Sequence, residues 1–380
     1  MSHILGPSVL SAFWTGPFCL AAEAIVGLVT LSGAFDMEMR EICWVTTTEK
    51  YGDSFFRSYV FRTWKDLYDI LVAKVPCSLQ LGALFPSHFI TEAVPVTPYP
   101  PIRRKARDKK TGEMKEMEIT IAQEPPREFE RKSFRHPVLD LVEPEMRQEN
   151  VSLHTPGGEI VLDVDLDCDK KQGEPQYDRE GICGCGKKKQ ICDVCAEIFL
   201  DTAQRVINYL LTEVYQLKAF FWVFSGRRGL HCWILDKRVH RMTNMQRETF
   251  IKRIMDMNGG RVKDDVADHI YEAFLKPVMD KYPIFRQRQA QKKHSSARET
   301  AFLELFPKLD VAVSIDASHL RKLPLTLHPA TGNLCVVVGH VDDPRYKFKY
   351  SEDGTIHATQ IRDEHMKVGA IRIKEALAKI

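Results

Sequence analysis

The sequence predicts a mixed α/β (α+β) fold, and three observations lead to that prediction. Runs of β-branched and aromatic residues, typical of strands, recur along the chain, as at residues 40–48 and 158–166. Longer stretches with apolar residues every three or four positions, typical of helices, lie between them, as at residues 193–215. The chain has 380 residues, 44% of them hydrophobic and 28% charged, which suits two or three folded units and excludes disorder of the whole chain.

A first α/β unit is predicted between residues 39 and 86. Residues 40–48 and 54–61 have the composition of neighbouring strands. Residues 64–75 place apolar side chains on one face of a helix, and residues 78–84 are predicted to form a further strand.

Composition changes between residues 97 and 150. Several prolines are followed by a basic run at residues 103–110 and by mixed charges with few apolar positions. Mixed charge of this kind does not build a core, so we expect a surface insertion that is partly disordered. The basic run is expected to be a solvated loop, with nucleic-acid contact or an import signal as alternatives.

Residues 1–37 are unusually apolar, and residues 4–22 carry no charge. No basic residues open this segment, as they would in a signal peptide, and Gly-Pro pairs at 6–7 and 16–17 would interrupt a membrane helix. Three interpretations remain open: a buried segment, a membrane-inserted one, and a start that does not belong to the working protein. Membrane insertion is the least favoured.

The predicted core resumes after the insertion. Strands are expected at residues 158–166, 218–224 and 230–235, with the helix at 193–215 among them. Residues 244–305 are expected to be largely helical, residues 309–335 to form short strands and turns, and the chain to end in a helix from about residue 365.

Two carboxylates stand on one face of a predicted strand. Asp163 and Asp165 are separated by Val164, and the strand period of two sends both acids to the same side. Paired acids on a rigid strand repel each other unless a cation lies between them, which is how phosphoryl-transfer sites hold two divalent ions. An exposed strand end or a calcium site would give the same pattern.

A turn between two strands carries a second signal. The string SGRRGLH at residues 225–231 places two arginines between two glycines, where backbone N–H groups and guanidinium groups can approach an oxyanion. The net charge of only +3 means that a polyanion must be bound by such a local patch. We interpret the turn as a triphosphate-binding site, with a solvated basic hairpin as the alternative.

Polar residues near residue 310 supplement these two sites. Asp310 directly follows an apolar position, and His319, Lys322 and His328 follow within the next eighteen residues. They would supply a third carboxylate and further phosphate donors if the fold brings them to the strand that carries Asp163.

Four of the ten cysteines lie in one short segment: Cys183, Cys185, Cys192 and Cys195. Two pairs of thiols separated by six residues have the number and reach for tetrahedral Zn²⁺, and four thiolates close the coordination shell. We expect a structural zinc site. Clustered cysteines also favour a reducing compartment over a disulfide framework.

Together these segments resemble the catalytic small subunit of archaeal and eukaryotic DNA primases, most closely the eukaryotic form. The likeness is carried by VLDVDL at 161–166, WVFSGRRGLHCW at 222–233, the cysteines at 183–195, and FPKLDVAVSIDASHLRKLPLTLHPATGNLCV at 306–336. It extends, with one insertion, from about residue 38 to about residue 338. The apolar start does not match the helical start usual in that family.

The resemblance implies a primase catalytic core with an RRM-like element at residues 38–345. Within it we expect the insertion at 97–150, a four-cysteine zinc module at 168–196 and a helical subdomain at about 244–305. Residues 346–380 would form a C-terminal segment that ends in a helix.

The resemblance also implies roles for individual residues. Asp163, Asp165 and Asp310 would bind the catalytic Mg²⁺ or Mn²⁺. The nucleotide would be bound by Ser225, Arg227, Arg228, His231, Lys322 and His328. Arg57 is a further nucleotide-binding candidate, because Arg40-Glu41 followed by Arg57 occupies the place of an earlier motif of the family.

The implied activity is synthesis of short RNA primers on single-stranded DNA from ribonucleoside triphosphates. The implied partners are a primase large subunit and the DNA polymerase α complex, in the nucleus or another reducing intracellular compartment, with no membrane. Two alternatives remain: a primase-polymerase of the repair or restart type that uses deoxynucleotides, and a non-catalytic zinc-containing subunit that binds nucleic acid.

Overall fold

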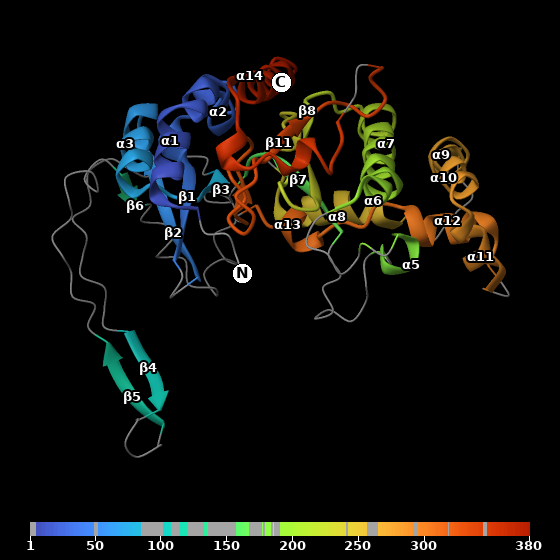
Figure 1. Ribbon diagram of the computed structural model, residues 1–380, viewed down its shortest axis with the longest axis horizontal. Coiled ribbons are helices and arrows are strands. Elements are labelled where there is room, and N and C mark those ends of the chain that lie inside the picture. The colour runs from blue at the N-terminus through green and yellow to red at the C-terminus, as the bar shows by residue number, and fades with distance from the viewer. Residues whose placement is uncertain are drawn as a thin grey trace.

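The computed structural model is a mixed helix and sheet structure, as the sequence predicts (Figure 1). It describes residues 5–48, 52–84, 102–107, 114–119, 133–135, 157–166, 177, 179–183, 185, 191–240, 242–256, 265–291, 295–317, 319–344 and 348–380. Within these residues two antiparallel sheets carry the fold. One hydrophobic cluster contains side chains of both sheets, and the other lies between the second sheet and the helices that cover it.

The first sheet has five strands in the order β10-β3-β1-β2-β6. Its strands are β1 (Arg40–Thr48), β2 (Gly52–Phe61), β3 (Ser78–Leu84), β6 (Ser133–Arg135) and β10 (Arg321–Lys322). Helix α3 (Trp64–Lys74) connects β2 to β3, and it begins at a capping box formed by Thr63 and Asp66. The strands and helix predicted for the first unit are therefore confirmed.

The second sheet has four strands in the order β11-β8-β9-β7. They are β7 (Ile160–Asp165), β8 (Phe220–Phe224), β9 (Gly229–Ile234) and β11 (Val336–Val338). Leu162 and Val164 of β7 are fully buried in the cluster beneath the helices, so the strand turns its other face, with the acids, away from that core.

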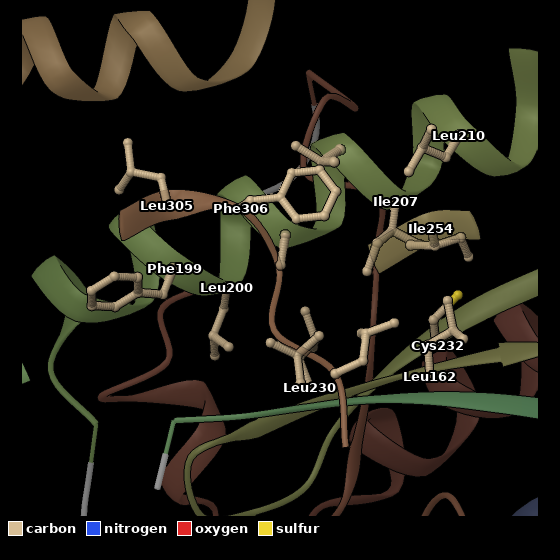
Figure 2. Packing of buried hydrophobic residues seen from close by; sticks show 14 of the residues in the cluster. Leu162, Phe199, Leu200, Ile207, Leu210, Leu230, Cys232, Ile254, Leu305 and Phe306 are labelled. Atoms are coloured by element: carbon tan, nitrogen blue, oxygen red, sulfur yellow. The ribbon is translucent and has the colours of Figure 1, made fainter. Parts of the chain in front are cut away.

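A continuous helical segment packs over this sheet. It comprises α6 (Asp193–Cys195), η4 (Ala196–Asp201), α7 (Thr202–Tyr209) and η5 (Leu210–Val214), of which η4 and η5 are π-helical. Figure 2 shows Phe199, Leu200 and Ile207 of this helix above the strands that carry Leu162 and Leu230. The apolar face that the sequence predicts for this helix is buried in the structure.

The more polar helices lie at one end of the molecule (Figure 1). They are α9 (Asp265–Ile270), η7 (Tyr271–Leu275), α10 (Lys276–Lys281), α11 (Pro283–Gln291) and α12 (Ala297–Leu305). Helix α8 (Asn244–Met255) precedes them in the chain and lies nearer the middle of the molecule (Figure 1). The short helices elsewhere are α5 (Arg179–Cys183), η2 (Met37–Met39), η8 (Asp353–Thr355) and η9 (Ala358–Gln360).

One segment differs from the expected strands and turns. Residues 311–315 form helix α13 (Val311–Ile315), which the β-branched sequence VAVSI does not suggest. The helix forms because Asp310 caps it, accepting hydrogen bonds from the backbone N–H groups of Ala312 and Val313.

Many side chains of the apolar N-terminal segment are buried in the hydrophobic cluster that both sheets share. The segment forms α1 (Pro7–Thr15), η1 (Pro17–Ala21) and α2 (Ala22–Val29). Helices η1 and α2 pack against α14 (Asp363–Leu377) near the other end of the chain, and α1 packs against α3 (Figure 1). Trp14 is fully buried, and its Nε1 donates to the carbonyl of Pro76 at 2.6 Å. By length and composition Pro7–Val29 could cross a membrane, alone among the described helices, and 44% of its most apolar window is buried.

The insertion contains a hairpin where a basic loop was expected. Strand β4 (Ile102–Arg107) pairs with β5 (Met114–Ile119), and Figure 1 shows this ribbon standing apart from both sheets. The register sets Arg103 opposite Glu118 and Lys105 opposite Glu116. The composition of the segment alone did not reveal this pairing.

A buried ion pair joins the first sheet to the residue that precedes β7, the strand that carries Asp163 and Asp165. Arg40 of β1 contacts both carboxylate oxygens of Glu159, at 3.1 and 2.7 Å, just before β7 begins. Arg247 donates to the carbonyls of Gly158 and Glu159 at 2.8 and 3.0 Å. Although burial opposes ionisation, the surrounding arginines lower the pKa of Glu159 to about 2. These contacts fix the start of β7.

Candidate active site and metal centre

The two acids of β7 lie next to β9 in an antiparallel register that sets Asp163 opposite His231 and Asp165 opposite Gly229. Oδ1 of Asp163 lies 3.3 Å from Nε2 of His231. That oxygen is buried and accepts no well-aligned hydrogen bond from the described residues. Asp165 is more open, with 47% of its side chain exposed.

The acids have opposite pKa shifts. Burial opposes ionisation of Asp163, but the facing His231 and the nearby Lys322 outweigh it and lower its pKa. Burial and the charge of Asp163 raise the pKa of Asp165. A cation between the two carboxylates would remove this repulsion, and the buried oxygen of Asp163 is a suitable ligand. The pair therefore fits a divalent metal ion.

The turn between β8 and β9 has a fixed geometry. The N–H of Ser225 donates to the carbonyl of Gly229 at 2.9 Å, and the N–H of Gly229 donates to Oγ of Ser225 at 3.1 Å. Gly226 has a positive φ of 79°, and a Cβ there would lie 3.0 Å from a backbone oxygen, so this position requires glycine. Arg228 is mostly buried, with Nε 3.7 Å from Oδ1 of Asp165.

A cavity of about 220 Å³ joins the acids to this turn. Most of the sequence-predicted residues line it: Asp163, Asp165, Ser225, Arg227, Arg228, His231, Lys322 and His328, with His319 beside them. Carboxylates on one wall and cations on the others suit a metal-bound triphosphate.

His328 is present as the neutral form. Burial and the surrounding cations lower its pKa to about 2. Its Nδ1 accepts a hydrogen bond from the N–H of Ala330 at 3.1 Å, so its proton is on Nε2. The Nε2–H group of the imidazole can therefore donate a hydrogen bond to an oxyanion in the cavity at any ordinary pH.

Asp310 lies beside the cavity rather than in its wall. Its N–H donates to the carbonyl of Asp163 at 2.9 Å, which places the two residues next to each other. Its Oδ1 accepts both capping bonds of α13. In the described part of the chain the three acids do not form a group whose ligand atoms all lie within 4.8 Å, so a shared ion requires the Asp310 carboxylate to turn toward the pair.

Some of the cavity residues were not predicted as site residues. Gln80 of β3 lies opposite Lys322 in the sheet register, Arg321 is almost fully buried, and Val313 belongs to α13. A glutamine in an otherwise apolar strand was the one available signal, and the pairing of β3 with β10 cannot be read from sequence. The Arg57 side chain lies outside the described residues, although its backbone is part of β2.

The four cysteines predicted as zinc ligands come together. Their sulfur atoms lie 2.9 to 3.4 Å apart across the closest pairs. Zn–S bonds of about 2.3 Å in a tetrahedron put sulfurs about 3.8 Å apart, so a small expansion would admit the ion. The cysteines are unbridged thiols. The donor set therefore fits zinc.

A buried cation accompanies the cysteines. Arg179 of α5 is almost fully buried, and its Nη2 donates to Sγ of Cys185 at 3.3 Å. Although burial opposes ionisation, hydrogen bonds from Cys183 and Arg179 lower the pKa of Cys185 to about 6. A guanidinium in this place offsets the negative charge of thiolates, and sequence inspection did not identify it.

Comparison with known proteins gives a consistent result. A family model described as DNA primase small subunit matches residues 163–339. The primase small subunit of Saccharomyces cerevisiae is 27% identical over 247 residues, covering 47% of this chain and 58% of the relative. The Caenorhabditis elegans subunit is 24% identical over 288 residues, covering 54% and 68%. The chain thus spans little more than half of the length of the yeast relative.

A solved structure, the polymerase domain from Mycobacterium tuberculosis ligase D in complex with DNA, aligns over 93% of this chain and 92% of that chain. It is 12% identical with a TM-score of 0.37, a likeness too distant to support any conclusion.

The paired acids lie beside a tight basic turn on an antiparallel sheet, and a four-cysteine cluster is part of the same fold. This arrangement suits a phosphoryl-transfer class of site. The matched segment, residues 163–339, contains both acids, the basic turn and the four cysteines. The chain is therefore similar to DNA primase small subunits, and the relatives that support this are eukaryotic.

Proposed function

We propose that this chain is the catalytic subunit of a DNA primase and joins ribonucleotides into short primers on single-stranded DNA. The observation that supports this most strongly is the single cavity in which Asp163 and Asp165 face the turn at residues 225–229. Nucleotidyl transfer needs both parts, because the acids hold divalent ions and the turn holds the phosphates.

The residues of the cavity have distinct roles in this proposal. Asp163, Asp165 and Asp310 would hold two Mg²⁺ or Mn²⁺ ions, which lower the pKa of the attacking hydroxyl and offset charge on the leaving group. The 3′-oxygen of one nucleotide forms a bond to the α-phosphorus of the next as the bond to the β-phosphate oxygen breaks and pyrophosphate leaves.

The cationic wall binds the triphosphate. Arg228 and Lys322 offset its charge, and neutral His328 donates from Nε2. His231 faces Asp163 and can bridge the metal ligand to a phosphate oxygen. Zn²⁺ held by the four cysteines would be structural, since four thiolates leave no open coordination position.

The partners are part of the same proposal. A primase large subunit would complete the enzyme, and the DNA polymerase α complex in the nucleus would receive the primer. Ribonucleoside triphosphates and a single-stranded DNA template would be the substrates.

The choice of sugar distinguishes this function from its alternatives. Purified chain is given poly(dT) with labelled ATP or dATP in Mn²⁺, with and without an annealed RNA primer. We expect extension mainly from ATP. Extension mainly from dATP would instead assign the chain to the restart type of primase-polymerase, and nucleotide binding without extension of the primed template would indicate a non-catalytic subunit.

A further inference from the structure

We propose that Tyr177 is a positioning residue that links the four-cysteine cluster to the metal ligand Asp310. The proposal rests on the proposed function, because it takes Asp310 to bind a catalytic ion. Its basis is a set of contacts between segments that are more than one hundred residues apart in the sequence.

The hydroxyl of Tyr177 is buried at the beginning of the cysteine segment. It accepts a hydrogen bond from the backbone N–H of Lys308 at 2.8 Å. Its ring packs against Phe199 with the centroids 4.5 Å apart, and the side-chain amine of Lys308 lies 5.2 Å from its centroid. Tyr177 thus contacts both the helix that follows the cysteines and the segment that leads to Asp310.

The segment from α12 to Asp310 is held by the buried side chains of Phe306 and Leu309 and by hydrogen bonds of its backbone. It is extended at Phe306 and again at Asp310, and Figure 2 shows it running from the helix layer near Phe306 toward the strand that carries Leu230. In an extended segment the N–H groups of alternate residues point to the same side. The N–H of Lys308 bonds to Tyr177, and that of Asp310 bonds to the carbonyl of Asp163.

Tyr177 is in turn fixed by the cysteine segment. The N–H of Arg179 donates to the carbonyl of Tyr177 at 3.0 Å. The side chain of Arg179 donates to Sγ of Cys185 at 3.3 Å, a hydrogen bond that a zinc-bound thiolate would also accept. Closing the four sulfurs around an ion therefore fixes Arg179, then Tyr177, then the backbone two residues before Asp310.

The test replaces Tyr177→Phe, which keeps the ring packing and removes the acceptor. Tyr282→Phe is the matched control, because the Tyr282 hydroxyl donates to Glu197 at 2.8 Å, outside the Asp310 segment. Mn²⁺ binding is measured directly by electron paramagnetic resonance, without nucleotide or template. Loss of one neutral hydrogen bond should weaken Mn²⁺ binding by about threefold to tenfold in the Tyr177 variant, with zinc content unchanged and the control like wild type.

A double variant provides a second test of the proposal. If Tyr177 acts through Asp310, Tyr177→Phe should add little to the loss of Mn²⁺ affinity caused by Asp310→Asn. Wild-type Mn²⁺ affinity in Tyr177→Phe, or full additivity with Asp310→Asn, would overturn the proposal. Wild-type protein that binds Mn²⁺ but makes no primer would contradict the proposed function alone.

Discussion

At the scale of single residues, the site depends on groups whose charge state is set by burial. Asp163 and His231 face each other across two strands, and Arg228 lies beside Asp165 with most of its guanidinium buried. Side chains held in this way are already oriented before a nucleotide arrives, which is the arrangement that electrostatic catalysis requires.

Arg228→Lys tests that orientation. Lysine keeps the charge but loses the planar donor group that can bind two phosphate oxygens. We expect kcat/KM for ATP on a primed template to fall by about tenfold to a hundredfold, since hydrogen bonds to charged groups contribute about 1.5 to 3 kcal/mol. Arg238→Lys, at an ion pair with Asp236 outside the cavity, is the control. Equal activity of the two variants would refute the role of Arg228.

His328 should make the protein sensitive to acid. Its pKa is about 2 in the folded chain and 6.5 as a free group, so below pH 6.5 the unfolded chain takes up a proton that the folded chain does not. Stability is therefore lost as pH falls below 6.5, by about 1 kcal/mol at pH 5.5.

His328→Asn removes this contribution. Urea unfolding at pH 7.5 and pH 5.5 should show a smaller loss of stability for the variant than for wild type. Identical losses in the two proteins would mean that His328 is protonated in the folded state, contrary to the role proposed for it.

At the scale of elements, some features could be predicted from sequence and others could not. The strand with Asp163 and Asp165 and the turn at residues 225–229 were predictable because period and turn chemistry are local. Gln80 and Tyr177 were not, because their contacts depend on segments far apart in the chain. Helix α13 was missed because its capping by Asp310 overrides the strand preference of valine and isoleucine.

The cysteine cluster is the element that a metal should hold together. We expect close to one zinc per chain by metal analysis, and Cys192→Ser should lower both zinc content and the melting temperature. Cys19, which lies outside the four-cysteine cluster, is the control, since Cys19→Ser alters no proposed ligand. Zinc-free protein with an unchanged melting temperature on Cys192→Ser would remove the structural role assigned to the site.

At the scale of the whole molecule, the two ends of the chain pack together, and α14 also packs against β8 and β11 of the second sheet. Helices α1, η1 and α2 contribute Trp14, Phe18 and Ile25, respectively, to the same cluster as Ile373 of α14. The apolar start is therefore accounted for by burial, although its pattern of charge alone left membrane insertion open.

Trp14→Ala tests whether these first helices stabilise the fold. Removing a fully buried indole and its hydrogen bond to Pro76 should cost about 3 to 5 kcal/mol in chemical unfolding. Leu20→Ala, on the exposed side of the same segment, should change stability by less than about 0.5 kcal/mol. A Trp14 variant as stable as wild type would show that the segment does not pack as described.

The central claim is that one cavity holds both the metal ions and the triphosphate for nucleotide joining. Its most direct test is formation of short RNA products from ATP on poly(dT) in Mn²⁺, comparing wild type with Asp165→Ala and with Asp342→Asn, which alters an exposed ion pair outside the cavity. The account predicts products from wild type and from Asp342→Asn, and none from a folded Asp165→Ala. Products from Asp165→Ala at the wild-type level would contradict it.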